Sequence, residues 1–329
     1  MSMIMTRTEL LKKLESDRNS RVIAYVTSER PPFAAKIAQD VIPLLGDILE
    51  SIGKVKKISL LLYTSGGDML APIRIVKLIR NHCDEFEVLV PYKAHSAGTL
   101  ICLGADSIVM GSLGELTPVD PTTGHPFNPR NPSNPQQPLE ISVEDLNSYF
   151  LFAKDKAGVK DDQMIEVYKL LVDKLHPLSI GNAYRAYRMA RLLTERLLML
   201  HMSKKKDGEK INKIVKEITG DITIHAFPID RDDAVGLGLK VEKASDEIDK
   251  SIRSIYETYA TEMKLGQPFH PNELLNGQES ADVARAGAYL ETSDMLYEFV
   301  FSGKVQKVMK DNQAAIDLNF NSQSWIKKR

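Results

Sequence analysis

The first 110 residues alternate between short apolar runs and stretches in which apolar residues recur at helical spacing, and this alternation constrains the fold more than any other feature of the chain. The predicted strands are Arg21–Thr27, Lys57–Tyr63, Phe86–Pro91 and Ser107–Met110. The predicted helices are Lys36–Ser51, Met69–Cys83 and Ala97–Leu103. Strands and helices in this order predict βαβ units, and therefore an α/β fold with a mainly parallel sheet.

The chain after residue 110 is organised differently. Seven prolines crowd Gly111–Pro138, and because proline fixes φ and lacks a backbone donor, we expect a long loop there. Helical spacing returns over residues 143–218, where the charged segment at 203–210 (SKKKDGEK) is predicted to be a surface turn. The elements predicted after it are a strand at Asp221–His225, a helix at Ala244–Leu265, a linker from Gly266 and a β-rich tail over Met295–Val308 and Ala314–Ile326.

Composition excludes several classes of protein. The 43 basic and 44 acidic residues among 329 give a formal charge of −1, so a polycation built for nucleic acid is not expected. Cys83 and Cys102 are the only cysteines and have no metal-ligand spacing, so we expect no disulfide framework and no metal. The N-terminal segment lacks an apolar signal-peptide core, and no window is apolar enough to span a membrane, which favours the cytoplasm.

Two turns follow predicted strands and open predicted helices. The first, Tyr63–Asp68 (YTSGGD), holds paired glycines, which tolerate positive φ and expose N–H groups where negative charge is stabilised. The second, His95–Thr99 (HSAGT), places Ser96 at the carboxyl edge of the sheet, where ligands of open α/β folds bind. Each turn alone is typical of an ordinary tight turn or helix cap, but together they predict a nucleophile beside an oxyanion hole.

These turns and two later segments resemble the serine dehydrogenase proteinase family of the Clp-protease/crotonase superfamily, which is related to signal peptide peptidase A. The similar segments are LLLYTSGGDMLAPIRIVKLIR, VPYKAHSAGTLICLGADSIVMG, LGELTPVDP and HAFPIDRDDAVGLGLKV. The resemblance implies a ββα superhelix with a mainly parallel sheet. It divides the chain into a peptidase domain over residues 1–243, with the proline-rich loop at 111–138 and a helical insertion, and a C-terminal helix and appendage over residues 244–329.

The resemblance also implies roles for individual residues. Ser96 is expected to be the nucleophile, and Gly66, Gly67 and the Ala97 N–H to stabilise the tetrahedral oxyanion. The general base stays open, because the stretch where Clp proteases carry their histidine has none. His225 lies in a segment that resembles the one delivering the Clp triad acid.

Other bases remain possible from the sequence. His125 in the proline-rich loop and His176 at a helix start are alternatives, as are a lysine, used by signal peptide peptidase relatives, or no base at all. His95 is expected to be structural, because the side chains of adjacent residues diverge.

The leading hypothesis is a serine endopeptidase that hydrolyses polypeptides through an acyl-enzyme, without a cofactor. Two alternatives are a crotonase-like acyl-CoA enzyme, which would use the same oxyanion hole for a thioester enolate, and a non-catalytic oligomeric scaffold or binding module. The resemblance further implies a homo-oligomer, a trimer or larger, and an ATPase or other protein as a possible partner.

Overall fold

The computed structural model describes residues 5–221, 226–310 and 313–329. Within them, contacts divide the chain into two compact units. Unit 1 comprises residues up to Leu116 together with Asp230–Arg329, and unit 2 comprises Thr117–Ile229.

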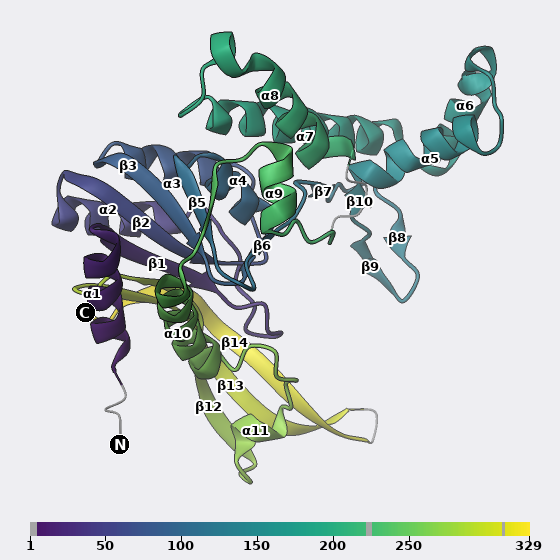
Figure 1. The fold of residues 1–329 in the computed structure, drawn as a ribbon. Coiled ribbons are helices and arrows are strands. Elements are labelled where there is room, and N and C mark those ends of the chain that lie inside the picture. The colour runs from purple at the N-terminus through teal and green to yellow at the C-terminus, as the bar shows by residue number, and fades with distance from the viewer. Residues whose placement is uncertain (1–4, 222–225, 311–312) are drawn as a thin grey trace. The chain divides into compact units, whose positions relative to one another are not determined.

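An eight-stranded sheet organises unit 1, in the order β11-β5-β3-β2-β1-β12-β13-β14 (Figure 1). The first five strands in this order are parallel to one another. The last three continue the sheet in antiparallel pairs, with β12 next to β1, β13 next to β12 and β14 next to β13. The strands are β1 (Arg21–Thr27), β2 (Val55–Tyr63), β3 (Cys83–Val90), β5 (Ser107–Met110), β11 (Val241–Lys243), β12 (Ser280–Glu291), β13 (Leu296–Lys310) and β14 (Gln313–Lys327), with the short pair β4 (Lys93–Ala94) and β6 (Glu115–Leu116) outside this sheet. An α/β fold with a mainly parallel sheet is therefore confirmed, and the β-rich tail belongs to that sheet.

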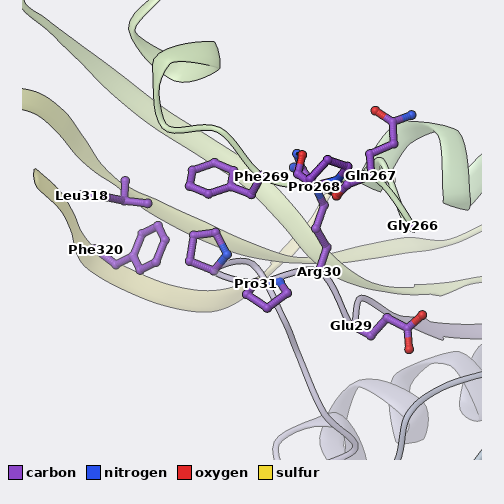
Figure 2. A pocket seen from close by; sticks show the side chains of 10 residues that line it. Glu29, Arg30, Pro31, Gly266, Gln267, Pro268, Phe269, Leu318 and Phe320 are labelled. Atoms are coloured by element: carbon purple, nitrogen blue, oxygen red, sulfur yellow. Dashed lines mark hydrogen bonds between the residues drawn. The ribbon is translucent and has the colours of Figure 1, made fainter. Parts of the chain in front are cut away.

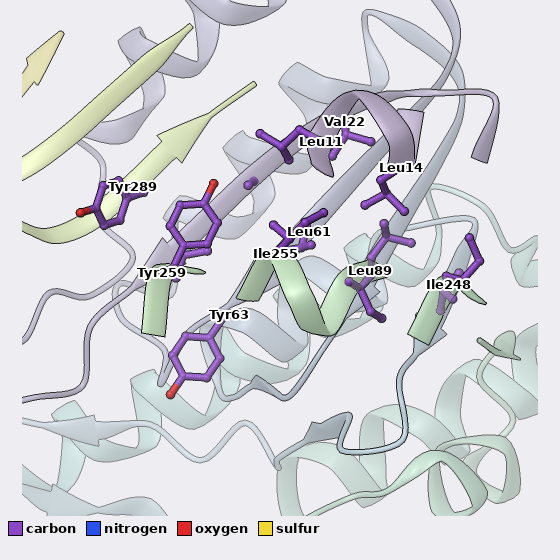
Figure 3. Packing of buried hydrophobic residues seen from close by; sticks show 14 of the residues in the cluster. Leu11, Leu14, Val22, Leu61, Tyr63, Leu89, Ile248, Ile255, Tyr259 and Tyr289 are labelled. Carbon is purple, nitrogen blue, oxygen red and sulfur yellow. The ribbon is translucent and has the colours of Figure 1, made fainter. Parts of the chain in front are cut away.

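Helices cover both faces of this sheet because its central strands are apolar on both sides. Leu11 and Leu14 of α1 pack with Ile255 and Tyr259 of α10 over one face, against sheet residues such as Leu61 (Figure 3). The helices α2, α3 and α4 lie on the other face (Figure 1). The helices of unit 1 are α1 (Arg7–Arg18), α2 (Val41–Ile52), α3 (Ala71–Arg80), α4 (Ala97–Leu103), α9 (Arg231–Leu237), α10 (Asp246–Met263) and α11 (Asn272–Leu275).

Unit 2 is mainly helical. Its longest helix, α7, packs on α8, and Leu193, Leu197, Ile211 and Ile214 are buried. The elements of unit 2 are β7 (Thr122–Thr123), β8 (Arg130–Asn131), β9 (Asn134–Pro138), β10 (Ile141–Ser142), α5 (Val143–Asp155), a 3-10 turn (Asp161–Gln163), α6 (Met164–Lys174), α7 (Pro177–Leu198), α8 (Lys204–Lys216) and a π-helical turn (Glu217–Asp221). The proline-rich segment is thus a loop with short strand pairs.

Two predictions of local structure are wrong. The segment at 203–210 is not a surface turn but the start of α8, because Ile211, Ile214 and Val215 give that helix a buried face. The helix predicted at Lys36–Ser51 begins only at Val41, because Ile37 pairs with Gly67 instead. The strand predicted at Asp221–His225 lies mostly outside the described residues, and the domain boundary at residue 243 stays a prediction.

A buried carboxylate holds α1 to the sheet and makes unit 1 sensitive to acid. Glu87 on β3 is fully buried and accepts hydrogen bonds from Arg18 of α1, from Lys57 Nζ at 2.8 Å and from Ser59 Oγ at 2.6 Å. Burial alone would raise the pKa of Glu87, but these donors outweigh it and lower the pKa. A carboxylate with a depressed folded-state pKa stabilises the fold above its unfolded pKa, about 4.3, and loses that contribution as the pH falls through the folded value.

We therefore expect Glu87→Gln to lower the free energy of unfolding at pH 7 by about 3 kcal/mol, because Arg18 and Lys57 lose a buried partner. The variant should also lose less stability than the unmodified chain between pH 6 and pH 3. Urea unfolding across this pH range measures both effects. Equal pH dependence in the two proteins would show that Glu87 is not the group responsible.

Candidate active site

The two turns singled out in the sequence are joined by backbone hydrogen bonds. Thr64, directly after β2, donates its N–H to Lys93 O at 2.9 Å, and His95 donates its N–H to Thr64 O at 3.1 Å. Thr64 also forms a parallel bridge with Ala94 of β4. The glycine turn and the serine turn therefore form one structural element at the carboxyl edge of the parallel strands.

Ser96 occupies a conformation that L-residues rarely adopt. Its φ is +51° and its ψ is −106°, and it is the residue immediately before α4. A positive φ at a residue other than glycine costs about 1–3 kcal/mol and persists only where the surroundings impose it. The side chain of Ser96 makes no cap hydrogen bond to α4, so helix capping does not account for this conformation. The sequence suggested a sharp turn here, and the structure shows which residue bears its strain.

Gly66 lies against Ser96. A Cβ built on Gly66 would sit 2.9 Å from Ser96 Cβ and 3.4 Å from Ser96 Oγ. Real Cβ atoms essentially never show the shorter of these contacts. With a φ of +110° as well, this position accepts only glycine, so the serine side chain faces bare backbone.

Gly67 is held by the segment that precedes α2. Ile37 donates its N–H to Gly66 O at 2.9 Å and accepts the Asp68 N–H at 2.8 Å. A Cβ at Gly67 would lie 2.1 Å from Ile37 O. Because Ile37 bonds to the residues on both sides of Gly67, the position of the Gly67 backbone is fixed.

The amide groups of these turns differ in their bonding. Gly66 donates its N–H to Thr64 Oγ1 at 3.0 Å. Among the described residues, the N–H groups of Gly67 and Ala97 have no acceptor. Ala97 is the first residue of α4, and N–H groups in the first turn of a helix lack intrahelical partners. Two backbone donors are thus available beside Ser96.

His95 is paired with Glu115 of β6. Its Nε2 lies 2.9 Å from Glu115 Oε1, and β6 pairs in parallel with β4, the strand directly before His95. Burial lowers the pKa of His95, although Glu115 favours the protonated ring. No pattern in the sequence indicates Glu115 as the partner of His95, because 20 residues separate the two.

The candidate bases lie in unit 2 or outside the described residues. Phe127 brings His125 and His176 together, with its ring stacked on His176 at 4.2 Å between centroids and 5.5 Å from the His125 ring. His176 Nδ1 accepts the Leu178 N–H and so caps α7, and His125 Nδ1 accepts the Phe127 N–H. His225 lies outside the described residues.

An apolar groove of about 920 Å³ opens in unit 1. Pro31, Phe269, Leu318 and Phe320 gather at one end of it, and Glu29 lies at the other (Figure 2). Glu29 accepts hydrogen bonds from Tyr63 OH at 3.0 Å and from Lys93 Nζ at 2.9 Å. The groove is therefore connected, through Glu29, to Tyr63 at the start of the first turn and to Lys93, two residues before the second.

Metal-ligating clusters and membrane-spanning helices are both absent from the part of the chain that the structure describes. Over the described ranges, no group of three or more His, Cys, Asp or Glu side chains is arranged to hold a metal ion. None of the helices in those ranges combines the length and apolar character that crossing a bilayer requires.

Comparisons with known proteins place these features in context. Two curated relatives come from Methanocaldococcus jannaschii. The uncharacterized protein MJ0137 is 35% identical over 127 residues, which are 36% of this chain and 44% of that protein. The uncharacterized protein MJ1495 is 25% identical over 268 residues, 79% of this chain and 78% of that protein. The chain thus spans less than half the length of the first of these relatives.

Solved structures with a related arrangement include two proteases. One is the 1510-N membrane-bound stomatin-specific protease, solved as a mutant in complex with a substrate peptide, at 15% identity and a TM-score of 0.37, covering 65% of this chain and 73% of that one. The other is ClpP1 from Listeria monocytogenes, at 15% identity and a TM-score of 0.37, covering 73% of this chain and 99% of that one.

The family assignment depends on a sequence model. The model described as "ClpP-like SDH-type serine proteinase" matches residues 1–177 of the 329 in this chain. The matched part contains both turns and the strands that carry them. Because the match covers more than half of the chain, the protein belongs to the family of ClpP-like, SDH-type serine proteinases.

Proposed function

We propose that the protein is a serine endopeptidase that hydrolyses polypeptides through an acyl-enzyme formed on Ser96. The observation that carries the proposal is the backbone of Ser96, held at a φ of +51° before α4 and against the bare backbone of Gly66. A strained residue at a strand-to-helix turn is expected where function requires its side chain to be presented. The family membership of the chain supports the same assignment.

The oxyanion donors in this proposal are the N–H groups of Gly67 and Ala97. The Gly66 N–H is already bonded to Thr64 Oγ1, so Gly66 is not proposed as an oxyanion donor. Because it has no side chain, it lets the substrate carbonyl come close to Ser96. Backbone N–H groups fixed before the reaction stabilise the developing oxyanion without reorganising. The pairing of the Gly67 turn with Ile37 supplies that rigidity.

The covalent steps follow from these roles. Ser96 Oγ attacks the scissile carbonyl carbon while a base takes the hydroxyl proton, and the leaving amine then receives that proton as the C–N bond breaks. Water hydrolyses the ester and restores the serine. His225 is proposed as the base, with His125, His176 or a lysine as alternatives. The reaction as written needs no metal or organic cofactor.

Incubation of the full chain with unfolded casein tests the reaction class. We expect release of new peptide N-termini, unchanged by EDTA and by iodoacetamide. Thiol alkylation should have little effect because Cys102 is buried and burial raises the pKa of Cys83 to about 11. Hydrolysis of acyl-CoA thioesters without peptide release would instead favour the crotonase-like alternative. No turnover of either substrate by the assembled oligomer would favour a scaffold.

Self-association is proposed as well, and unit 2 supplies the supporting observation. The helices α5, α6 and α7 expose large apolar side chains, which are Leu151, Phe152, Ile165, Leu170, Leu178 and Tyr184. Phe152 and Leu170 are 64% and 66% exposed. Contiguous exposed apolar surface marks interaction sites in folded proteins. Light scattering should show a trimer or larger, and a monomer at micromolar concentration would contradict the proposal.

A further inference from the structure

We infer that the buried hydroxyl of Thr64 is a positioning group for the oxyanion hole, an inference that rests on the proposed function of Ser96. Thr64 precedes the paired glycines by two residues and is fully buried. It touches neither the scissile bond nor the nucleophile in this account. Its role is to hold in place the backbone of the glycine turn, which supplies an oxyanion donor.

Every hydrogen-bonding capacity of the Thr64 hydroxyl is used. Thr64 Oγ1 accepts the Gly66 N–H at 3.0 Å and the Thr27 hydroxyl hydrogen at 2.9 Å. The Thr64 hydroxyl also donates to Gly66 O, with 3.4 Å between the two oxygens. A hydroxyl offers one donor and two acceptor sites, so Thr64 is saturated by three contacts, two of which are to the backbone of Gly66.

The methyl group of Thr64 adds a packing contact with the other half of the site. A Cβ at Gly98 in α4 would lie 2.6 Å from Thr64 Cγ2, so this helix packs tightly on the threonine. The main chain of Thr64 also bonds to Lys93 and His95, on either side of Ala94. One side chain therefore contacts the glycine turn through oxygen and the serine helix through carbon, and it sets the spacing of the Gly67 and Ala97 amides.

Two features separate this role from general packing. Val at position 64 would keep the shape and the methyl contact but would leave the buried Gly66 N–H without an acceptor, which frees the turn to move. Thr27 offers a matched control, because it is equally buried and only donates to Thr64. Replacing Thr27 with Val removes a hydrogen bond of the same network but leaves the one between Gly66 and Thr64 in place.

The experiment compares three variants of the full chain, Thr64→Val, Thr64→Ser and Thr27→Val. The quantities measured are kcat and KM on a fluorogenic peptide and the rate of labelling by a fluorophosphonate. We expect Thr64→Val to lower kcat and the labelling rate about 10²-fold, with KM changed less than threefold, because misplaced catalytic groups cost this much. Thr64→Ser should recover kcat to within about fivefold. Thr27→Val should lower the melting temperature by less than Thr64→Val, because it removes one hydrogen bond of the three, and should keep kcat within about threefold.

A kcat for Thr64→Val close to that of the unmodified chain would overturn the inference, and so would an equal loss in Thr27→Val or a lack of recovery in Thr64→Ser. If Thr64→Val does not fold, Thr64→Cys replaces it, because a thiol is a weak acceptor of similar size; full activity of that variant would also overturn the inference. Full activity of Ser96→Ala would reject the proposed function itself. Loss in Ser96→Ala without loss in Thr64→Val rejects only the role of Thr64.

Discussion

Ser96→Ala is expected to lower kcat for peptide hydrolysis by about 10⁴- to 10⁶-fold, the range seen when the nucleophile of a serine protease is removed. The hydroxyl is the only part of the site lost, since alanine keeps the Cβ that contacts Gly66. Steady-state kinetics on a fluorogenic peptide measure the loss. Activity within tenfold of the unmodified chain would exclude Ser96 as the nucleophile.

The strain at Ser96 supplies a control for this variant. Ser96→Gly also lacks the hydroxyl, so it should be as inactive as Ser96→Ala. It should be more stable than Ser96→Ala by about 1 kcal/mol, because glycine tolerates the φ of +51° and the gain exceeds its entropic cost. Urea unfolding of the two variants measures the difference. Equal stabilities would show that this backbone is relaxed and would remove the observation on which the assignment depends.

Gly67→Ala is expected to lower kcat by about 10²- to 10³-fold, the effect of losing one oxyanion donor. The added Cβ would lie 2.1 Å from Ile37 O, so the turn must move away from Ile37 and take its N–H with it. The two backbone hydrogen bonds of Ile37 should weaken, lowering the free energy of unfolding by about 1–3 kcal/mol.

The matched control for this variant is Gly46→Ala in α2. A Cβ at Gly46 meets nothing within 4 Å, and alanine is the better helix former by about 1 kcal/mol. Gly46→Ala should therefore keep full kcat and raise the stability. If Gly67→Ala retained kcat within threefold, the Gly67 amide would not serve as an oxyanion donor.

Much of the sheet could be predicted from the sequence because its signals are local. The strand Arg21–Thr27 and the helix Ala97–Leu103 have the bounds that their apolar patterns predicted. The antiparallel attachment of β12 to β1 was not predictable, because the pairing of Ala24 with Glu291 joins residues far apart in the chain. The late start of α2 has the same origin, since its cause is a bridge between Ile37 and Gly67.

In the candidate site, too, some features have a local signal in the sequence and others depend on contacts between distant residues. Its glycines and serine are visible in the sequence, because the φ that each turn requires restricts which residues fit. The roles of Thr64, Ile37 and Glu115 depend on contacts that no spacing in the sequence reveals. The general base is left open by the sequence for the same reason, because long stretches of chain separate Ser96 from His125, His176 and His225.

Covalent labelling tests the central claim most directly. The folded 329-residue chain is treated with a fluorophosphonate and digested, and the modified peptide is identified by mass spectrometry. The account predicts one phosphonylated residue, Ser96, and no labelling of Ser96→Ala or of the chain unfolded in urea. Labelling at another serine, or none in a protein that hydrolyses casein, would contradict it.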